Sequence, residues 1–599
     1  MREGWILLLA GAALLPAPAL AAAPAEDTSA AAGTDGIPAQ LDAAQRDGYR
    51  SVFAAIHDER WQDAQLSLDT LSPGPLHAIA RAELYTAHGS PKVEAAPIVD
   101  LLTQAPELPE AEQLARLARA KGAEVVPDLP VAQHLLWIDG APNRLRAKSV
   151  KSDAVAADLA ARMQPFVKDD AGASAQALLD ATDGLSPEAL TEWQHKVGWM
   201  YYLAGDDANA RAMEAKAAAG SGDWAVQARW IGALAAWRQN DCAAAGKAFE
   251  DTASRAGDTE LRAAGLYWAA RTDMVCGRPD RVEARLKNAA QYRETFYGLL
   301  SRQALGIVEV KQTTGDRFVT ADWVALERRP NIRVAAALVE VGEDALAEQV
   351  IRRQAQIGSP ADYPALSRIA AKLDLPATAL WLSHNAPVGA TPPLMARYPA
   401  PSWTPDGGWR VDKALVWAHT LQESQFRTRV TSPAGAYGLM QIMPAAATDF
   451  ARENGGAVDR AALTRPSTNI GIGQRHLERL RDMTGITGGL LPKVVAAFNA
   501  GPAPVQMWNA TVRDGGDPLL YIESIPYWET RGYVMTVLRN YWMYEAQSGR
   551  AASSSRSALA QGMWPRFPGL PGPAMVRLNA RPARNVTASL ISSPAARAD

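Results

Sequence analysis

The feature that most constrains the fold of this chain is a helical spacing of apolar residues that runs almost without interruption from about residue 42 to residue 306. Apolar side chains recur every three or four positions, which is the period of an amphipathic α-helix, and strand-like alternation is hard to find. Short breakers rich in Gly, Pro, Ser and Asp separate the helices, at 72–75, 205–207 and 220–222. The sequence therefore predicts an all-α fold.

A weak repeat lies in the middle of this region. Three similar segments lie 34 residues apart, at 198–202, 232–236 and 266–270, and Cys242 and Cys276 keep the same step. A period of 34 residues is typical of helix-turn-helix solenoids, whose hairpins bury their apolar faces by stacking on one another. We therefore expect an α-superhelix over residues 42–325.

Cys242 and Cys276 are the only cysteines, which is too few for a disulfide framework. In an oxidising compartment they could pair. Two unpaired, buried small residues are the preferred interpretation. Neither cysteine lies in a His/Cys/Asp cluster at metal-ligand spacing, so no metal site and no cofactor are predicted.

The N-terminus has the pattern of a secretory signal peptide over residues 1–23. A basic start is followed by an apolar run from Trp5 to Leu20 and by the small residues 21–23. The run is short for a membrane span and is interrupted by Pro16 and Pro18. No cysteine follows the cleavage site, so we expect an exported protein that is not a lipoprotein and has no membrane span in its mature form.

Composition shifts divide the rest of the chain. A chain of 599 residues is too long for one hydrophobic core. We predict a flexible leader at 24–41, a helical linker domain at 326–395, and a C-terminal domain at 396–546 that follows a proline-rich stretch. The final segment, 547–599, holds seven arginines against one aspartate and reads as a disordered tail. A formal net charge of −3 provides no field for nucleic acid or an anionic membrane.

The C-terminal domain contains the candidate chemistry. Asp412 can cap a helix with apolar residues on one face, and this helix presents Glu423 at its C-terminal end. A loop rich in glycine and methionine follows at 432–444 and contains Gln441 and Met443. A carboxyl packed against apolar groups loses hydration, so its pKa rises and it can act as a general acid near neutral pH.

Two later segments add polar and aromatic groups. Residues 494–502 predict a helix stopped by a glycine and a proline, which places Asn499 near its end. Residues 521–533 combine acids, including Glu523, with aromatic side chains. Carboxylates and aromatic faces together suit sugar rings, although packing alone would also explain the aromatic residues.

These motifs, in this order, resemble those of soluble lytic transglycosylases. They are Glu423-Ser424, then 435–441 (GAYGLMQ), then 497–502 (AFNAGP), then 523–526 (ESIP). The resemblance implies an all-α protein with an N-terminal superhelix that can close into a ring, a small helical linker domain and a C-terminal lysozyme-like α domain. It also implies periplasmic action on peptidoglycan glycan strands, with cell-wall synthesis or secretion proteins as potential partners and with no nucleic acid.

The same resemblance implies the roles of the site residues. Glu423 is the single acid and base that cleaves between N-acetylmuramic acid and N-acetylglucosamine and leaves a 1,6-anhydro end. Ser432 supports it, and the groove residues are Gln441, Met443, Phe498, Asn499 and Glu523. Phe498 departs from the family, which has tyrosine there, so either Ser432 or a bound water replaces the missing hydroxyl, or the rate is lower. The residues after Glu423 lack the usual Asn-Pro, which we expect to be a local turn variation.

Two alternatives remain at this point. A hydrolase of the goose-type lysozyme class would keep the fold and Glu423 but use water as acceptor. An inactive wall-binding scaffold would use the superhelix and keep the C-terminal domain only for docking, an idea to which Phe498 lends weight.

Overall fold

The computed structural model describes residues 36–307, 317–454, 458–549 and 553–578. The regular secondary structure of these residues is almost entirely α-helical, with two short antiparallel strand pairs: β1 (Leu135–Trp137) with β2 (Asn385–Pro387), and β3 (Trp564–Pro565) with β4 (Met575–Val576). The all-α prediction is therefore confirmed. No helix within these ranges is both long and apolar enough to cross a bilayer.

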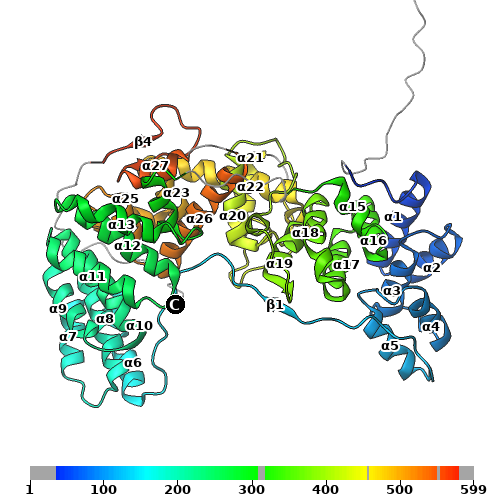
Figure 1. Ribbon diagram of the computed structural model, residues 1–599, viewed down its shortest axis with the longest axis horizontal. Helices are drawn as coiled ribbons and strands as arrows, with labels where there is room; N and C mark the ends of the chain where they lie inside the picture. Colours follow the sequence, from blue (N-terminus) through cyan, green and yellow to red (C-terminus); the bar gives the residue numbers. More distant parts are fainter. Residues whose placement is uncertain (1–35, 308–316, 455–457, 550–552, 579–599) are drawn as a thin grey trace, which may run out of the picture.

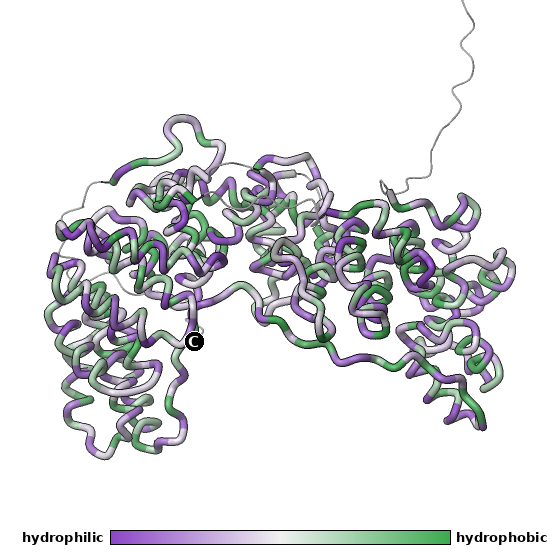
Figure 2. The backbone as a smooth tube through the Cα atoms, viewed as in Figure 1, coloured by the Kyte–Doolittle hydropathy of each residue, from purple (hydrophilic) through white to green (hydrophobic). Residues whose placement is uncertain are grey.

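The helices form an arch with a helical lobe at each end (Figure 1). A closed ring is not seen in this view, where the two lobes stand apart. Figure 2 shows polar and apolar residues alternating along the helices of both lobes, as expected for amphipathic helices that bury one face.

The repeat lobe is the part of the arch that contains the 34-residue period. Its helices are α6 (Ala154–Lys168), α7 (Gly172–Asp180), α8 (Pro187–Ala204), α9 (Asp207–Ala218), α10 (Gly222–Arg238), α11 (Cys242–Arg255), α12 (Thr259–Val275), α13 (Pro279–Ala289) and α14 (Phe296–Ala304). The three repeat segments fall in α8, α10 and α12, the first helices of successive hairpins, and consecutive helices pack on one another. The superhelical repeat is therefore present in this lobe.

The terminal lobe, at the other end of the arch, joins two parts of the chain that are far apart in sequence. It contains α1 (Ala43–His57), α2 (Trp61–Thr70), α3 (His77–Thr86), α4 (Ala95–Gln104) and α5 (Ala111–Ala120), together with α15 (Thr320–Leu326), α16 (Pro330–Val341), α17 (Asp344–Ile357), α18 (Tyr363–Lys372) and α19 (Pro376–His384). Both sets share one hydrophobic core.

This shared core corrects two predicted boundaries. The superhelix does not continue through residues 42–325, and residues 326–395 are not a separate linker domain, because α1–α5 pack with α15–α19 rather than with α6–α14. The connecting strap, residues 121–153, is largely extended. It is held by the β1–β2 pair and by Gln133, whose backbone N–H donates to the Gln356 carbonyl at 2.8 Å.

The prediction of two unpaired cysteines is wrong. Cys242, the first residue of α11, and Cys276, which follows α12, form a disulfide with their Cα atoms 5.9 Å apart. Stacking of successive hairpins brings equivalent repeat positions together, and this separation lies within the range a disulfide spans. The 34-residue step that suggested the repeat therefore also explains the pairing.

The prediction of a disordered tail from residue 547 is wrong for residues 553–578. They form α27 (Ser554–Ala560) and the β3–β4 pair, and the scattered apolar residues Trp564 and Phe567 are buried in the core of the C-terminal domain. The Trp564 indole donates to the Gly516 carbonyl at 2.8 Å. Residues 579–599, the predicted signal peptide at 1–23 and the predicted leader up to residue 35 lie outside the described ranges. Ile37 and Leu41, the described end of that leader, are buried in the terminal lobe.

Candidate active site

The C-terminal domain lies between the lobes and consists of α20 (Lys413–Ser424), α21 (Pro444–Asn454), α22 (Pro466–Asp482), α23 (Leu491–Ala500), α24 (Pro502–Thr511), α25 (Pro518–Glu523) and α26 (Trp528–Gln547), with α27 against it. Helix α20 packs against α26, which also contacts α23. Its core is continuous with that of the repeat lobe.

Glu423 stands at the end of α20, as predicted. The Asp412 carboxylate caps the helix by accepting the Ala414 N–H at 2.9 Å. The helix ends in two consecutive left-handed residues, Gln425 (φ 53°) and Phe426 (φ 62°). Phe426 is buried against Trp417, at 5.9 Å between ring centroids, so packing holds this uncommon turn in place.

Tyr533 provides the hydroxyl that the sequence analysis expected to be missing. It lies on α26, is buried, and donates to Glu423 Oε1 at 2.5 Å. The Tyr533 hydroxyl oxygen also lies 2.8 Å from Nδ1 of His419, which stands one turn before Glu423 on α20. Tyr533 lies in the aromatic segment noted in the sequence, but no local pattern relates it to a glutamate 110 positions earlier.

The surroundings of Glu423 make it a weak acid. Burial raises the pKa of its carboxyl from 4.5 to about 7; the Tyr533 hydrogen bond opposes this rise, and the negative charge of Glu529 adds to it. No ion pair to Glu423 occurs within the described ranges. A carboxyl with such a pKa can give up a proton and take one back near neutral pH.

The glycine–methionine loop is held mainly from within its own domain. Gly438 adopts a left-handed conformation (φ 76°), and a Cβ there would lie 2.3 Å from the Asn469 amide nitrogen. Asn469, on α22, is fully buried; it donates to the Tyr437 and Leu463 carbonyls and accepts from the Met440 N–H at 2.9 Å. The sequence analysis missed Asn469, because a lone asparagine in a helix carries no local signal.

Three predicted residues belong to this loop. The Ser432 hydroxyl oxygen accepts the Ala436 N–H at 3.0 Å, and no hydrogen bond joins Ser432 to Glu423 in the part of the chain described. The Gln441 amide donates to the carbonyl of Gly438 at 2.9 Å. Met443 is 45% exposed. Ser432 and Gln441 thus shape the loop, and the Met443 side chain is available for contact.

The third motif also lies at this site. The Phe498 ring packs on His419, with 4.5 Å between ring centroids, and on His476, with 5.3 Å. Asn499 accepts a hydrogen bond from the Thr530 hydroxyl at 2.6 Å, which ties α23 to the start of α26. Residues from α20, α23 and α26 therefore surround the Glu423 carboxyl.

Glu523 does not belong to this site, contrary to the prediction that it lines a saccharide groove. Its carboxylate is fully buried and forms a bidentate ion pair with Arg144 of the strap. The two guanidinium nitrogens of Arg144 lie 2.6 and 3.0 Å from the carboxylate oxygens. It also accepts the Tyr297 hydroxyl of α14 at 2.6 Å. The prediction failed because an acid beside aromatic residues suits an internal ion pair as well as a sugar.

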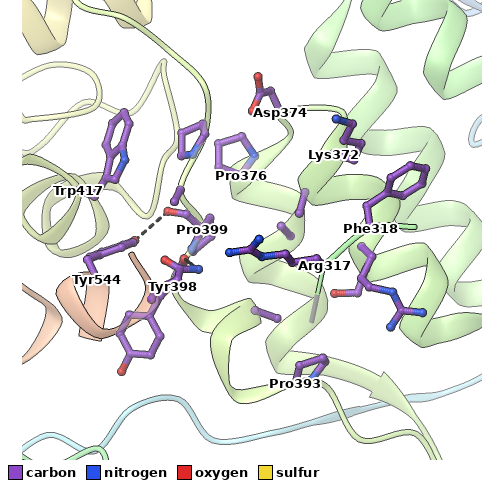
Figure 3. A pocket seen from close by; sticks show the side chains of 18 of the residues that line it. Arg317, Phe318, Lys372, Asp374, Pro376, Pro393, Tyr398, Pro399, Trp417 and Tyr544 are labelled. Atoms are coloured by element: carbon purple, nitrogen blue, oxygen red, sulfur yellow. Dashed lines mark hydrogen bonds between the residues drawn. The ribbon is translucent and has the colours of Figure 1, made fainter. Parts of the chain in front are cut away.

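A separate cavity of about 640 Å³ lies where the terminal lobe meets the C-terminal domain (Figure 3). Arg317, Lys372 and Pro376 line it on one side and Trp417 and Tyr544 on the other, and the Tyr544 hydroxyl donates to the Pro399 carbonyl at 2.9 Å. Glu423 is not among its lining residues. Within the described ranges, no group of three or more His, Cys, Asp or Glu side chains is arranged to hold a metal ion.

The comparison with known families addresses the domain that holds this carboxyl. Residues 406–519 match the family described as "Transglycosylase SLT domain". The C-terminal domain is a transglycosylase SLT domain. The resemblance to soluble lytic transglycosylases is confirmed for this SLT domain, which contains Glu423 and the glycine–methionine loop.

Curated relatives extend the similarity. The chain is 29% identical over 313 residues to the soluble lytic murein transglycosylase of Salmonella typhimurium, covering 50% of this chain and 46% of that protein. It is 38% identical over 133 residues to the protein of the same name from Escherichia coli K12, covering 22% and 20%. The matched part thus spans about half, or less, of these relatives' length.

A solved structure supports the fold. The complex of the 70-kDa soluble lytic transglycosylase with bulgecin A aligns with a TM-score of 0.52 and 18% identity, covering 88% of this chain and all of that one. The likeness therefore reaches beyond the SLT domain into the helical lobes.

Proposed function

We propose that this protein is a lytic transglycosylase that cleaves peptidoglycan glycan strands without water. The observation that carries the proposal is Glu423: a carboxyl inside an SLT domain, with a pKa of about 7, one oxygen bonded to Tyr533, and no ion-pair partner in the described chain. The names of the similar proteins, soluble lytic murein transglycosylases, support peptidoglycan as the substrate.

The chemistry needs one carboxyl to act twice. Protonated Glu423 donates its proton to the oxygen between N-acetylmuramic acid and N-acetylglucosamine, and the bond from that oxygen to muramic C1 breaks. The N-acetyl oxygen of the same sugar stabilises the positive charge at C1. The Glu423 carboxylate then takes the proton of the C6 hydroxyl, and O6 bonds to C1. This step closes the 1,6-anhydro ring and returns Glu423 to its protonated form.

A hydrolase would need a second carboxylate to activate water. Glu529, on the first turn of α26, is the carboxylate whose charge raises the pKa of Glu423. Under our proposal it takes no part in bond cleavage, so Glu529→Gln keeps most of the activity. A loss of activity comparable to that of Glu423→Gln would favour the hydrolase instead.

To test this proposal, purified sacculi are digested with the protein, and the masses of the released products are measured by mass spectrometry. We expect muropeptides lighter by one water than the hydrolytic products, and none from Glu423→Gln. Hydrolytic masses would make the enzyme a lysozyme, and the absence of any product from the wild type would favour a binding scaffold.

We further propose that the protein acts in the periplasm after cleavage of its N-terminal segment behind Ala21 or Ala23. N-terminal sequencing of the protein from a periplasmic extract tests this: the expected start is residue 22 or 24, and an intact Met1 in the cytoplasmic fraction would contradict it. Protein partners from wall synthesis or secretion stay a prediction.

A further inference from the structure

His419 is a buried polar side chain that the proposed chemistry does not use. It lies on α20, four residues before Glu423, and has no exposed surface. Its Nδ1 lies 2.8 Å from the Tyr533 oxygen, which lies 2.5 Å from Glu423 Oε1. Three side chains from two helices thus form one hydrogen-bonded chain that ends on the proposed acid.

The number of available protons determines which group donates each hydrogen bond between His419, Tyr533 and Glu423. Burial lowers the pKa of His419 to about 3, so the ring is neutral and carries one N–H. An ionised Glu423 can only accept, so Tyr533 must give its single proton to Oε1. The Tyr533 oxygen is then free to accept, and Nδ1 of His419 is the donor that faces it.

The surroundings of the second ring nitrogen, Nε2, support the tautomer with the proton on Nδ1. Nε2 has no hydrogen-bond partner among the described residues, and the ring packs on Phe498 at 4.5 Å between centroids. A proton on Nε2 would leave one N–H unpaired and also deprive the Tyr533 oxygen of its donor. The Nδ1–H tautomer leaves a single bare nitrogen lone pair against an apolar ring.

We propose that His419 is a positioning residue that, through Tyr533, keeps the proton of Glu423 on Oε2. With His419 donating to Tyr533 and Tyr533 donating to Oε1, the acid proton has only Oε2 available, an oxygen with no hydrogen bond to any described residue. Without the imidazole, Tyr533 can turn and accept from a proton on Oε1, so that the acid is partly presented on the wrong oxygen.

The inference rests on the proposed function of Glu423 as acid and base, but its effect on the carboxyl can be measured separately. His419→Leu and His419→Phe remove the donor, whereas His419→Asn keeps an N–H close to the position of Nδ1. The titratable groups next to these three side chains are Glu529 on α26 and His476 on α22, and both stay unchanged in these variants.

The first readout is the rate. Both apolar variants should lower kcat about tenfold, which is the upper end of the effect of losing one neutral hydrogen bond, with little change in KM. His419→Asn should retain most of the wild-type kcat. Equal loss in His419→Asn and His419→Leu, an effect on KM alone, or no effect would overturn the proposal. Circular dichroism and thermal unfolding identify any variant that has lost its fold, and the phenylalanine variant then replaces the leucine one.

The second readout does not need activity. The carboxyl carbon of Glu423, labelled with ¹³C-glutamate and assigned with Glu423→Gln, is titrated by NMR. Loss of the His419 donor weakens the Tyr533 hydroxyl as a donor, so the pKa of Glu423 should rise by about half a unit in His419→Leu and stay near the wild-type value in His419→Asn. A fall would mean that the imidazole accepts from Tyr533, and the proposal would be wrong. A wild type without anhydro product would overturn the proposed function, while this titration would still decide the role of His419.

Discussion

Glu423 and Glu523 are a matched pair within one chain. Each is followed by serine, each stands at the end of a helix, and each accepts a tyrosine hydroxyl, from Tyr533 and Tyr297 respectively. Only Glu523 has a cation, Arg144, among the described residues. The comparison shows that the surroundings decide the role of the same Glu-Ser motif. A buried glutamate without a cation nearby can serve as an acid, whereas one that meets a buried arginine forms a structural ion pair.

The largest expected effect concerns activity. Glu423→Gln should lower kcat by at least about a thousandfold, because one group provides both the proton donor and the acceptor. The midpoint of thermal unfolding should change little, since the amide replaces a carboxyl whose pKa is about 7 and whose site therefore already accommodates the neutral form. Release of soluble muropeptides from sacculi measures the rate.

The matched variant, Glu523→Gln, should lower the stability of the protein and leave kcat largely unchanged. It leaves the buried Arg144 guanidinium without its counter-charge, which costs about 3–5 kcal/mol of unfolding free energy. Urea unfolding measures the loss, and activity is measured at a temperature where the variant is folded. A thousandfold loss of kcat in folded Glu523→Gln would return this residue to the saccharide groove and break the comparison.

The third expectation is a pH dependence of the unfolding free energy, to which Glu423 contributes. Its pKa is raised from 4.5 to about 7, so the folded state binds more protons than the unfolded state between these values. Stability therefore falls as pH rises through this window, by about 2 kcal/mol from this half-buried group. Buried acids such as Glu260, whose pKa is also raised to about 7, add similar slopes.

The difference in unfolding free energy between the wild type and Glu423→Gln isolates the contribution of Glu423, because the other acids contribute equally to both proteins. Urea unfolding at pH 4.5 and 7.5 measures it. A difference that does not change with pH would show that the carboxyl is not held in its neutral form.

The smallest effects come from the two tyrosines. Tyr533→Phe removes the hydrogen bond that opposes the rise of the Glu423 pKa, so the alkaline limb of the activity profile, where the acid loses its proton, should move to higher pH and kcat should fall about tenfold. Tyr297→Phe should cost about 1–2 kcal/mol of stability and leave the pH profile unchanged. A shifted pH profile in Tyr297→Phe would mean that the two carboxyls are coupled.

The sequence predicts those parts of the molecule that depend on neighbours along the chain. The helical class, the hairpin repeat in α8–α13 and the placement of Glu423 at a capped helix end all follow from three- and four-residue spacing and from a capping aspartate. The loop glycine Gly438 belongs to the same class, because its left-handed conformation is a local requirement.

The remainder depends on packing between distant segments. Arg144 meets Glu523 across 379 positions, and Tyr533 meets Glu423 across 110. No periodicity encodes such pairs, and the tail was misjudged for the same reason, because Trp564 finds its burial against residues of the SLT domain. A buried side chain in a sequence of ordinary composition looks identical to a solvated one until its partner is known.

The strap at 121–153 has a consequence for the order in which the protein is made. Helices α1–α5 are synthesised first, yet the apolar faces they bury in the terminal lobe need α15–α19, which end at residue 384. Nearly two hundred residues of other structure must emerge before that lobe can close. The first helices are therefore exposed to premature association throughout synthesis, while the repeat lobe between them can stack hairpin by hairpin. Chaperone dependence should accordingly concentrate at the beginning of the chain, far from the residues that carry out catalysis.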